Sequence, residues 1–424
     1  MNISALFLLS LAIIRTPLFV IIAASAMLGF YSEDIDLSVI SIEVYRLAEM
    51  PVLLAIPLFT FAGYLLGESQ ASTRLVNLTN SLLGWMPGGL AIVAIFACAM
   101  FTAFTGASGI TIIALGALLY PALKQSGYNE SFNLGLLTSS GSLGLLFAPS
   151  LPLILYGVVA QQMSLDTPVG IDQLFLAGIL PGLLMLVMLS IYAMTQPRTI
   201  NKKKPFDAKI AFEAIKAAKW EIPLPLIVLG GIYGGYFAVS EAAAVTALYV
   251  LIAEVFIIRE IKLNQLTAIM RDSMVMVGGI MIIIGVSLAS TNYLIDTEVP
   301  TRLFDFIQLH IDDKLTFLIL LNLFLLTLGM MLDIFSAIVI IVPIILPIAV
   351  GYGIHPVHLG IIFLANMQLG YFTPPVGMNL FIASYRFNKP VMSLYKATIP
   401  FFFILLVSVL IITYWPALSL VFID

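Results

Sequence analysis

Charged residues are scarce in this chain. Only 10% of its 424 residues are Asp, Glu, Lys or Arg, whereas about a quarter are charged in a typical soluble domain. Hydrophobic residues make up 61%. Apolar stretches such as 174–194, 274–295 and 398–421 are each long enough to cross a hydrocarbon core of about 30 Å as a helix. The composition excludes an ordinary soluble protein and predicts a chain that crosses a lipid bilayer several times.

Other features are also missing. A single cysteine, Cys98, rules out an intrachain disulfide. The sequence contains no phosphate-binding loop motif of the Walker A type, so ATP is not expected to drive the protein directly. The alternating pattern of membrane barrel strands is absent. Because backbone groups in lipid must be hydrogen-bonded within the chain, an all-α polytopic fold is predicted.

Positive charge is concentrated between residues 196 and 220. Seven Lys or Arg residues lie there, against two acidic ones, Asp207 and Glu213. The positive-inside rule therefore places the basic loop 196–220 in the cytoplasm of a multi-pass protein of the bacterial inner membrane. A basic run between two spans is typical of this topology, and no nucleic-acid partner is expected.

Two apolar segments in the first half are interrupted. The run that begins after Gly88-Gly89 reaches residue 104, where the small residues 105–109 (Thr-Gly-Ala-Ser-Gly) separate it from a second run ending at Pro121. This pattern predicts a helical hairpin that enters the membrane and turns back. The next segment, 132–157, is interrupted at 141–144 and at 148–152 by glycine and proline, which leave backbone carbonyls unpaired.

The same pattern returns 226 residues later. Residues 317–328 lead to a second tip at 329–333 (Gly-Met-Met-Leu-Asp), and the following segment is broken at 373–377 (Thr-Pro-Pro-Val-Gly). The common offset pairs identical residues without a gap: Pro121 with Pro347, Gly127 with Gly353, Leu143 with Leu369, Gly144 with Gly370, and Pro149 with Pro375. An internal duplication is predicted, and we expect the two repeats to be inverted in the membrane.

Matched broken helices in two halves indicate a secondary transporter, in which half-helix ends and unwound carbonyls bind ions and anions near the midplane. The predicted fold is therefore an ion-transporter-like helical bundle with two repeats, each containing a re-entrant hairpin and a broken helix. Its expected parts are scaffold spans with an arm, a first and a second transport unit each made of a hairpin plus a broken helix, further scaffold spans, and a C-terminal span. In chain order the boundaries are 1–85, 86–160, 161–311, 312–386 and 387–424.

Three amphipathic segments lie between the broken ones, at 72–83, 261–271 and 300–310. Each is predicted to be an interfacial helix or an arm that braces a moving part.

Sodium as the coupling ion needs oxygen ligands, which freed carbonyls and Ser or Thr hydroxyls provide. The first candidate site consists of Thr105, Ser108 and the carbonyls of Gly144, Phe147 and Pro149. The second consists of Gly329, Asp333, Gly370, Thr373 and the carbonyl of Val376. Asp333 has two interpretations, because a carboxylate at a hairpin tip can serve an ion or cap the following half-helix.

A different class of function is also compatible with the first tip. Residues 106–109 (Gly-Ala-Ser-Gly) fit the serine motif of an intramembrane hydrolase, in which Ser108 would need a histidine within hydrogen-bond reach. The candidates are His310, His355 and His358. This hypothesis leaves the duplication unexplained, so an enzyme is not expected.

The motifs resemble those of a known family, the large membrane subunit of the tripartite ATP-independent periplasmic (TRAP) transporters, over essentially the whole length. The resemblance rests on 56–63, 83–91, the tip 105–109, 141–144, 177–182, 231–235 with 241–243, and 370–377. Many relatives carry Ser-Gly-Ser-Ser at the first tip, where this chain has residues 105–108, and a Pro pair where it has Ala148-Pro149.

The resemblance implies a sodium-driven importer of a small organic anion, a carboxylate or a sulfonate, that works by an elevator mechanism. It implies two protein partners: a small four-span membrane subunit of the Q type and a periplasmic substrate-binding protein of the P type. No organic cofactor is expected. Nothing in the residues selects one organic acid.

Overall fold

The computed structural model describes residues 7–8, 10–11, 13–14, 16–163, 167–196 and 206–423. Within this part the chain is helical and contains no strand. Seven helices are long and apolar enough to cross a membrane, and the bent pair Glu130–Leu146 plus Leu151–Gln162 supplies an eighth. The predictions of an all-α fold and of several membrane spans are confirmed.

The two repeats are visible as equivalent series of helices. The first contains α5 (Ala71–Leu83), α6 (Gly89–Thr105), α7 (Ser108–Gln125), α8 (Glu130–Ser140), the short turn η3 (Leu143–Leu146) and α9 (Leu151–Gln162). The second contains α16 (Val299–Gln308), α17 (Lys314–Met331), α18 (Ile334–Gly351), α19 (Pro356–Gly370) and α20 (Met378–Phe387). Both hairpins turn and both following helices break where glycine and proline predicted.

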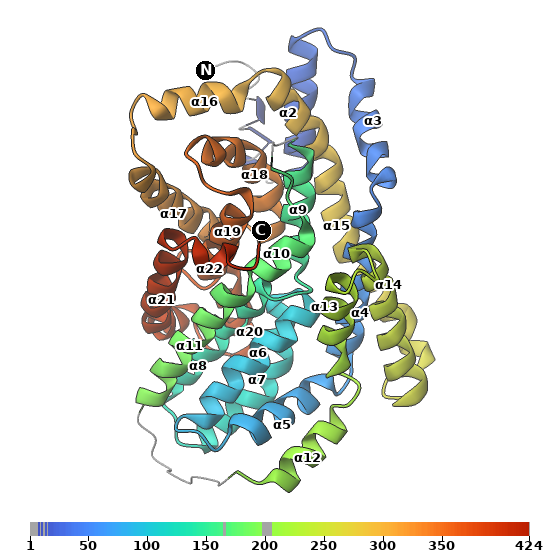
Figure 1. Cartoon of the computed structure of the whole chain (residues 1–424), viewed down its shortest axis with the longest axis vertical. Coiled ribbons are helices and arrows are strands. Elements are labelled where there is room, and N and C mark those ends of the chain that lie inside the picture. Colours follow the sequence, from blue (N-terminus) through green and yellow to red (C-terminus); the bar gives the residue numbers. More distant parts are fainter. Residues whose placement is uncertain are drawn as a thin grey trace.

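The repeats have opposite orientations. The arm α5 and the hairpin α6–α7 occupy the lower half of the molecule, while the arm α16 and the hairpin α17–α18 occupy the upper half (Figure 1). Each hairpin therefore enters from its own side, and the expected inversion is found. The interruptions at the two breaks contain the Ala148–Pro149 and Pro374–Pro375 cis peptide bonds.

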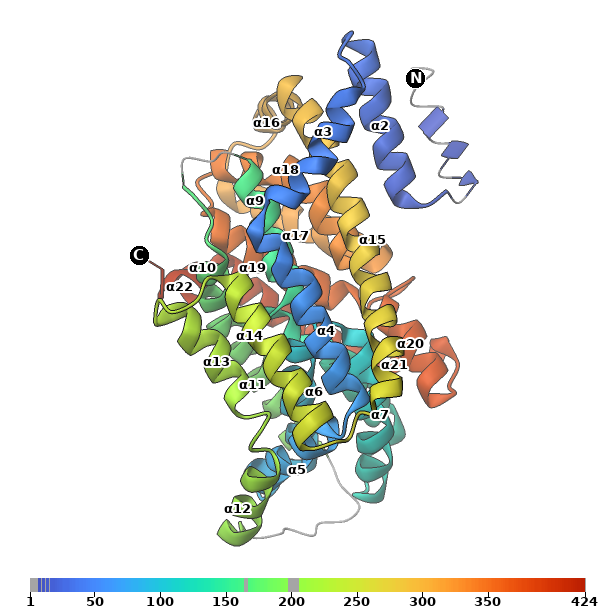
Figure 2. The ribbon, with the colours of Figure 1, turned by 90° about the vertical axis from the view of Figure 1, so that its right-hand side faces the viewer.

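Long helices form a wall beside the hairpins. Helix α15 (Leu263–Asp296) lies next to α4 (Ala55–Glu68), and α14 (Val239–Leu251) packs on the other side of α4 (Figure 2). Helices α2 (Leu18–Ser32) and α3 (Ser38–Arg46) also pack on α15, and the short turns η1 (Leu47–Glu49) and η2 (Pro51–Leu54) connect α3 to α4.

One amphipathic segment was predicted wrongly. The predicted segment 261–271 is not a separate interfacial helix, because residues 263–271 are the first turns of α15 and no glycine or proline follows before residue 278. The other two segments do form distinct amphipathic helices, α5 and α16, and their role as interfacial or bracing arms stays a prediction.

The remaining helices cover the hairpins or lie at the lower end. Helices α10 (Ile171–Ala177), α11 (Ile179–Thr195), α21 (Val391–Tyr414) and α22 (Ala417–Leu420) pack on the hairpins and broken helices. Helix α13 (Pro223–Tyr233) lies on α14, and α12 (Ala208–Ala217) lies on the arm α5. Which helices move together stays a prediction. Residues 197–205, which hold four of the seven Lys and Arg residues of the basic loop, lie outside the described residues.

Glycine allows each hairpin to pack closely on its broken helix. A Cβ atom built on Gly370 would lie 2.4 Å from the backbone of Gly329. In the first repeat, a Cβ atom on Gly144 would lie 2.2 Å from the carbonyl oxygen of Ala99. The neighbour is backbone in both cases, so it cannot rotate away, and the glycines set the distance between the two elements.

We predict that Gly370→Ala destabilises the protein, because the added methyl group must displace the α17 backbone, at a cost of about 1–3 kcal/mol. Gly278→Ala is the matched control. It adds the same methyl group inside α15, where a Cβ atom meets nothing within 4 Å, so stability should be unchanged or slightly higher. The thermal unfolding midpoint in detergent measures both. Equal midpoints for the two variants would contradict the packing argument.

Candidate ion and substrate site

The first hairpin tip is built from a glycine turn. Gly106 ends α6 with a φ of 67°, in the left-handed region that glycine adopts readily, and Ala107 is extended before α7 begins at Ser108. The hydroxyl of Thr105 donates to the carbonyl of Ala107 at 3.5 Å. No side chain caps α7. Its first backbone N–H groups are therefore available to a ligand.

A residue that the sequence did not single out links this tip to the other repeat. The Ser108 hydroxyl donates to Oδ1 of Asn379 at 2.8 Å, and Nδ2 of Asn379 donates to the carbonyl of Thr138 at 3.3 Å. Asn379 is completely buried. A polar residue two positions after the 373–377 break was a usable signal, but its partners lie more than 200 positions away.

Two buried threonines hold the first hairpin closed. The Thr102 and Thr111 hydroxyls lie 2.6 Å apart across the hairpin, and Thr102 also donates to the carbonyl of Gly141 at 2.8 Å. Gly141 begins the interruption of the adjacent broken helix. The hairpin and the break are thus joined by side chains as well as by glycine packing.

The second tip is capped. Oδ1 of Asp333 accepts the backbone N–H groups of Phe335 and Ser336 at 3.0 Å each, and Oδ2 accepts the Ser336 hydroxyl at 2.5 Å. The capping interpretation of Asp333 is therefore confirmed. An additional ion role stays a prediction.

The second break is attached to this tip through the backbone. The N–H of Ile334 donates to the Tyr371 hydroxyl at 2.8 Å, and the N–H of Gly377 donates to the carbonyl of Met330 at 3.0 Å. The Thr373 hydroxyl donates to the carbonyl of Leu369 at 2.6 Å and keeps its lone pairs. The structure thus brings Gly329, Asp333, Gly370 and Thr373 into one region, with Val376 at its exposed edge.

The first break is more deeply enclosed. The Phe147 N–H donates to the carbonyl of Gly144 at 3.0 Å, and the Ser150 hydroxyl donates to the carbonyl of Leu145 at 2.5 Å. Pro149 is buried, and Phe147 is partly buried against Gly182 of α11. The predicted carbonyls of the first site lie close together, and one of them already accepts a hydrogen bond.

Both tips face one cavity of about 440 Å³. Residues 106–110 of the first tip and 333–335 of the second line it, together with Leu145 and Tyr371 from the two breaks. Tyr64 of α4 and Met276 of α15 close the opposite wall. Cavities that bind small molecules have this size. The cavity therefore lies between the two hairpins and the long helices α4 and α15.

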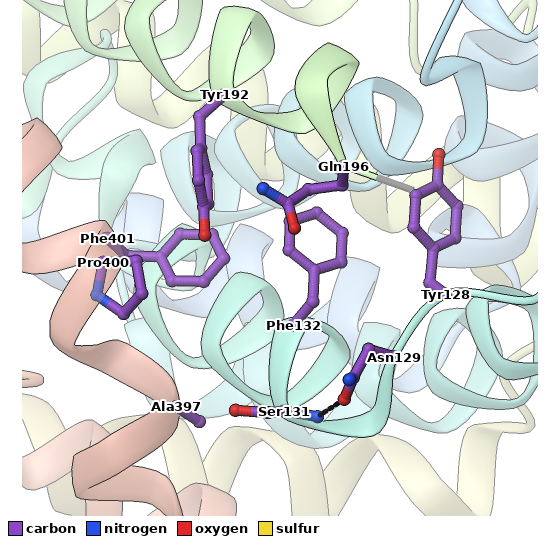
Figure 3. Close-up of a pocket in the computed structure, with 9 residues that line it drawn as sticks. All are labelled: Tyr128, Asn129, Ser131, Phe132, Tyr192, Gln196, Ala397, Pro400 and Phe401. Atoms are coloured by element: carbon purple, nitrogen blue, oxygen red, sulfur yellow. Dashed lines mark hydrogen bonds between the residues drawn. The ribbon is translucent and has the colours of Figure 1, made fainter. Parts of the chain in front are cut away.

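A second cavity, of about 210 Å³, is shown in Figure 3. Aromatic side chains from α8, α11 and α21 line it, among them Phe132, Tyr192 and Phe401. The residues around it make packing contacts, and neither tip reaches it.

The hydrolase hypothesis is not supported by this geometry. Ser108 is bonded to the amide of Asn379, not to an imidazole. His310 contacts the carbonyl of Phe306, His358 contacts the carbonyl of Thr413, and His355 accepts an N–H at the start of α19. No histidine lines the tip cavity within the described part of the chain.

Comparison with known structures supports the fold. The structure of the YdaH transporter from Alcanivorax borkumensis matches with a TM-score of 0.66 over 90% of this chain and 88% of that chain, at 15% sequence identity.

Comparison with known sequences identifies the family. The isethionate TRAP transporter permease protein DctMQ of Oleidesulfovibrio alaskensis is 37% identical over 87% of this chain, which spans 58% of that protein. The C4-dicarboxylate TRAP transporter large permease protein DctM of Pseudomonas aeruginosa is 33% identical over 90% of this chain and 88% of that protein. Residues 4–418 match the family described as the tripartite ATP-independent periplasmic transporter, DctM component. The chain therefore belongs to the DctM family of TRAP transporter large permeases and is a multi-pass protein of the bacterial inner membrane.

Proposed function

We propose that this protein imports a small organic acid together with sodium, and that it does so by an elevator movement of the two hairpin units along the long helices. The observation that carries the proposal is the cavity between the two tips. Elements of both inverted repeats line one side of it, and the long helices line the other. A cargo there would move with the hairpins while α4 and α15 stay in place.

The chemistry of the cavity supports a role for a cation. Among the described residues that line it, none is Lys, Arg or His, and Asp333 is acidic. An organic anion would enter this site against a carboxylate and without a positive side chain, which is unfavourable in a low-dielectric region. Bound sodium near each tip supplies the missing positive charge, so that anion binding depends on sodium.

The two tips offer different surroundings to the cargo. The α7 N-terminus has no side-chain cap, whereas Asp333 occupies the α18 N-terminus. A carboxylate or sulfonate is therefore expected to lie towards α7, where free N–H groups and the helix dipole favour an anion. The names of the relatives, which include isethionate and C4-dicarboxylate permeases, support an organic acid as substrate.

We further propose that a small membrane subunit and a periplasmic binding protein work with this chain. The outer surface of α3 is available for the small subunit, because Ile42 and Tyr45 are 56% and 70% exposed although α3 packs on α15. Helix α3 belongs to the long-helix scaffold, which stays in place during the proposed elevator movement.

Sodium dependence tests the proposed sites. We predict that Ser108→Ala and Thr373→Ala each raise the sodium concentration for half-maximal uptake about ten-fold, because losing one oxygen ligand costs about 1–2 kcal/mol. Uptake is measured in proteoliposomes with the cognate binding protein and an inward sodium gradient. Thr327→Val is the control, since its hydroxyl bonds only the carbonyl of Leu323 on an exposed face of α17.

An unchanged sodium requirement in both site variants would contradict the proposed sodium ligands, but it would not contradict membership of the family. Uptake that is equally fast with potassium in place of sodium would contradict the coupling itself. The thermal unfolding midpoint of each variant separates lost ion binding from lost folding.

The partner surface has its own test. A photo-crosslinking residue replacing Tyr45 of α3 is predicted to react with the small subunit. The same residue replacing Tyr385 of α20, which is 89% exposed, is predicted to react with lipid only, because α20 belongs to the moving unit. Crosslinks to the small subunit from Tyr385 and not from Tyr45 would reverse the assignment.

A further inference from the structure

One guanidinium group binds three carboxylates at the lower end of the molecule. Arg74 of the arm α5 donates from Nε to Glu221 at 2.5 Å, from Nη2 to Glu254 at 3.0 Å and from Nη1 to Glu260. Glu260 also accepts the backbone N–H of Gln70 at 2.7 Å. Together these four side chains form what we call the Arg74 cluster.

The carboxylates come from three different parts of the chain. Glu221 lies in the turn between α12 and α13, and Glu260 lies in the loop that leads into α15. Glu254 lies in the π-helical segment η4 (Ile252–Ile257), whose wider turn ends α14. The carbonyl of Glu254 also accepts the N–H groups of Glu260 and Ile261. The cluster therefore fastens the arm to three scaffold elements at once.

The charges of the cluster do not balance. One positive group faces three negative ones, so three ionised carboxylates would leave a net charge of −2. Glu221 and Glu254 are each only 1% exposed, and Oε2 of each has no hydrogen-bond partner. Like charges this close cannot all stay ionised in a poorly solvated site. The two unpartnered oxygens are positions where a missing positive charge can bind.

Among the described residues of the surrounding elements, no second Lys, Arg or His forms an ion pair with these carboxylates. Lys219 lies over the ring of Trp220, Arg259 donates to the carbonyl of Phe256, and Lys262 is exposed. Tyr249 of α14 donates to the carbonyl of Trp220. Within the described residues, no group of three or more His, Cys, Asp or Glu side chains is arranged to hold a metal ion. The missing charge is thus best supplied by a proton.

We propose that the Arg74 cluster binds a proton from the cytoplasm on Glu221 or Glu254, and that this proton determines how firmly the arm α5 is held to the scaffold. The carboxylate takes the proton from water that reaches the cluster past Glu260, whose side chain is 24% exposed. The cytoplasmic side follows from the neighbouring basic loop and from α12, which packs on α5 (Figure 1).

The direction of the effect follows from burial. Burial raises the pKa of Glu221 above its ordinary value, with Arg74 acting in the opposite direction. Burial lowers the pKa of Arg74, but the charges and hydrogen bonds of the three glutamates together raise it above its ordinary value, so the guanidinium stays charged. As the pH rises from the ordinary pKa of a glutamate through the raised pKa of the buried carboxyl, the proton leaves. The carboxylates then repel one another, and the stability that the cluster contributes is lost. The arm should loosen at high pH and be held at lower pH.

The cluster is present on one arm only. The position equivalent to Arg74 in the second repeat is 74 + 226 = 300, which is Pro300 of α16. The duplication therefore does not explain the cluster. The Arg74 cluster acts on the cytoplasmic arm α5, which connects the scaffold helix α4 to the moving hairpin. The cluster would therefore respond to the cytoplasmic pH.

Two measurements on the purified full chain in lipid nanodiscs test this proposal without requiring transport. Infrared difference spectroscopy from about pH 5 to about pH 9 covers the range in which buried glutamates titrate. We expect a protonated carboxyl band that disappears as pH rises. It should be lost in Glu221→Gln or in Glu254→Gln, and kept in the control Glu213→Gln, an exposed residue of α12. A wild-type spectrum without such a band, or a band that survives in both cluster variants, would overturn the proposal.

Hydrogen exchange of the α5 backbone is the second measurement. After correction for the intrinsic pH dependence of exchange, the wild-type rate should rise by up to about ten-fold per pH unit, the limit for release of one proton. The variant that loses the infrared band should show a flat profile, because its neutral amide cannot be deprotonated. Equal slopes in the wild type and in both cluster variants would refute the link between the proton and the arm, whatever the outcome of sodium uptake.

Discussion

The whole arrangement depends on a constraint of the hydrocarbon phase, where a broken helix must find partners for every backbone group that the break sets free. In the second repeat, such partners come from other segments. The Tyr371 hydroxyl accepts the Ile334 N–H, and the carbonyl of Met330 accepts the Gly377 N–H. The second break is therefore held in part by hydrogen bonds to its hairpin. This constraint explains why glycines lie at both contact points and why the cavity forms where the tips meet.

Duplication supplied two similar units, but the units now differ chemically. The first break is enclosed by its neighbours, whereas Pro374, Pro375 and Val376 of the second are exposed. The α7 N-terminus is uncapped, and the α18 N-terminus is neutralised by Asp333. Two different environments on opposite sides of one cavity orient an asymmetric molecule better than two identical ones would.

The sequence predicted the features whose signals are local. Glycine and proline marked both tips and both breaks, and the constant offset revealed the repeats. It could not predict contacts that depend on tertiary packing. Asn379 was missed because its partners Ser108 and Thr138 are distant in the chain. Residues 263–271 were misjudged because their polar face is typical of an interfacial helix, although the backbone continues without a break into α15.

The bond between Ser108 and Asn379 also bears on the ancestry of the protein. The equivalent positions in the opposite repeats are 108 + 226 = 334 and 379 − 226 = 153, which are Ile334 and Leu153. Two copies of the first half would pair a serine with a leucine, and two copies of the second would bury an asparagine against an isoleucine. At this contact neither half can replace the other, so the bond requires both halves of the present chain.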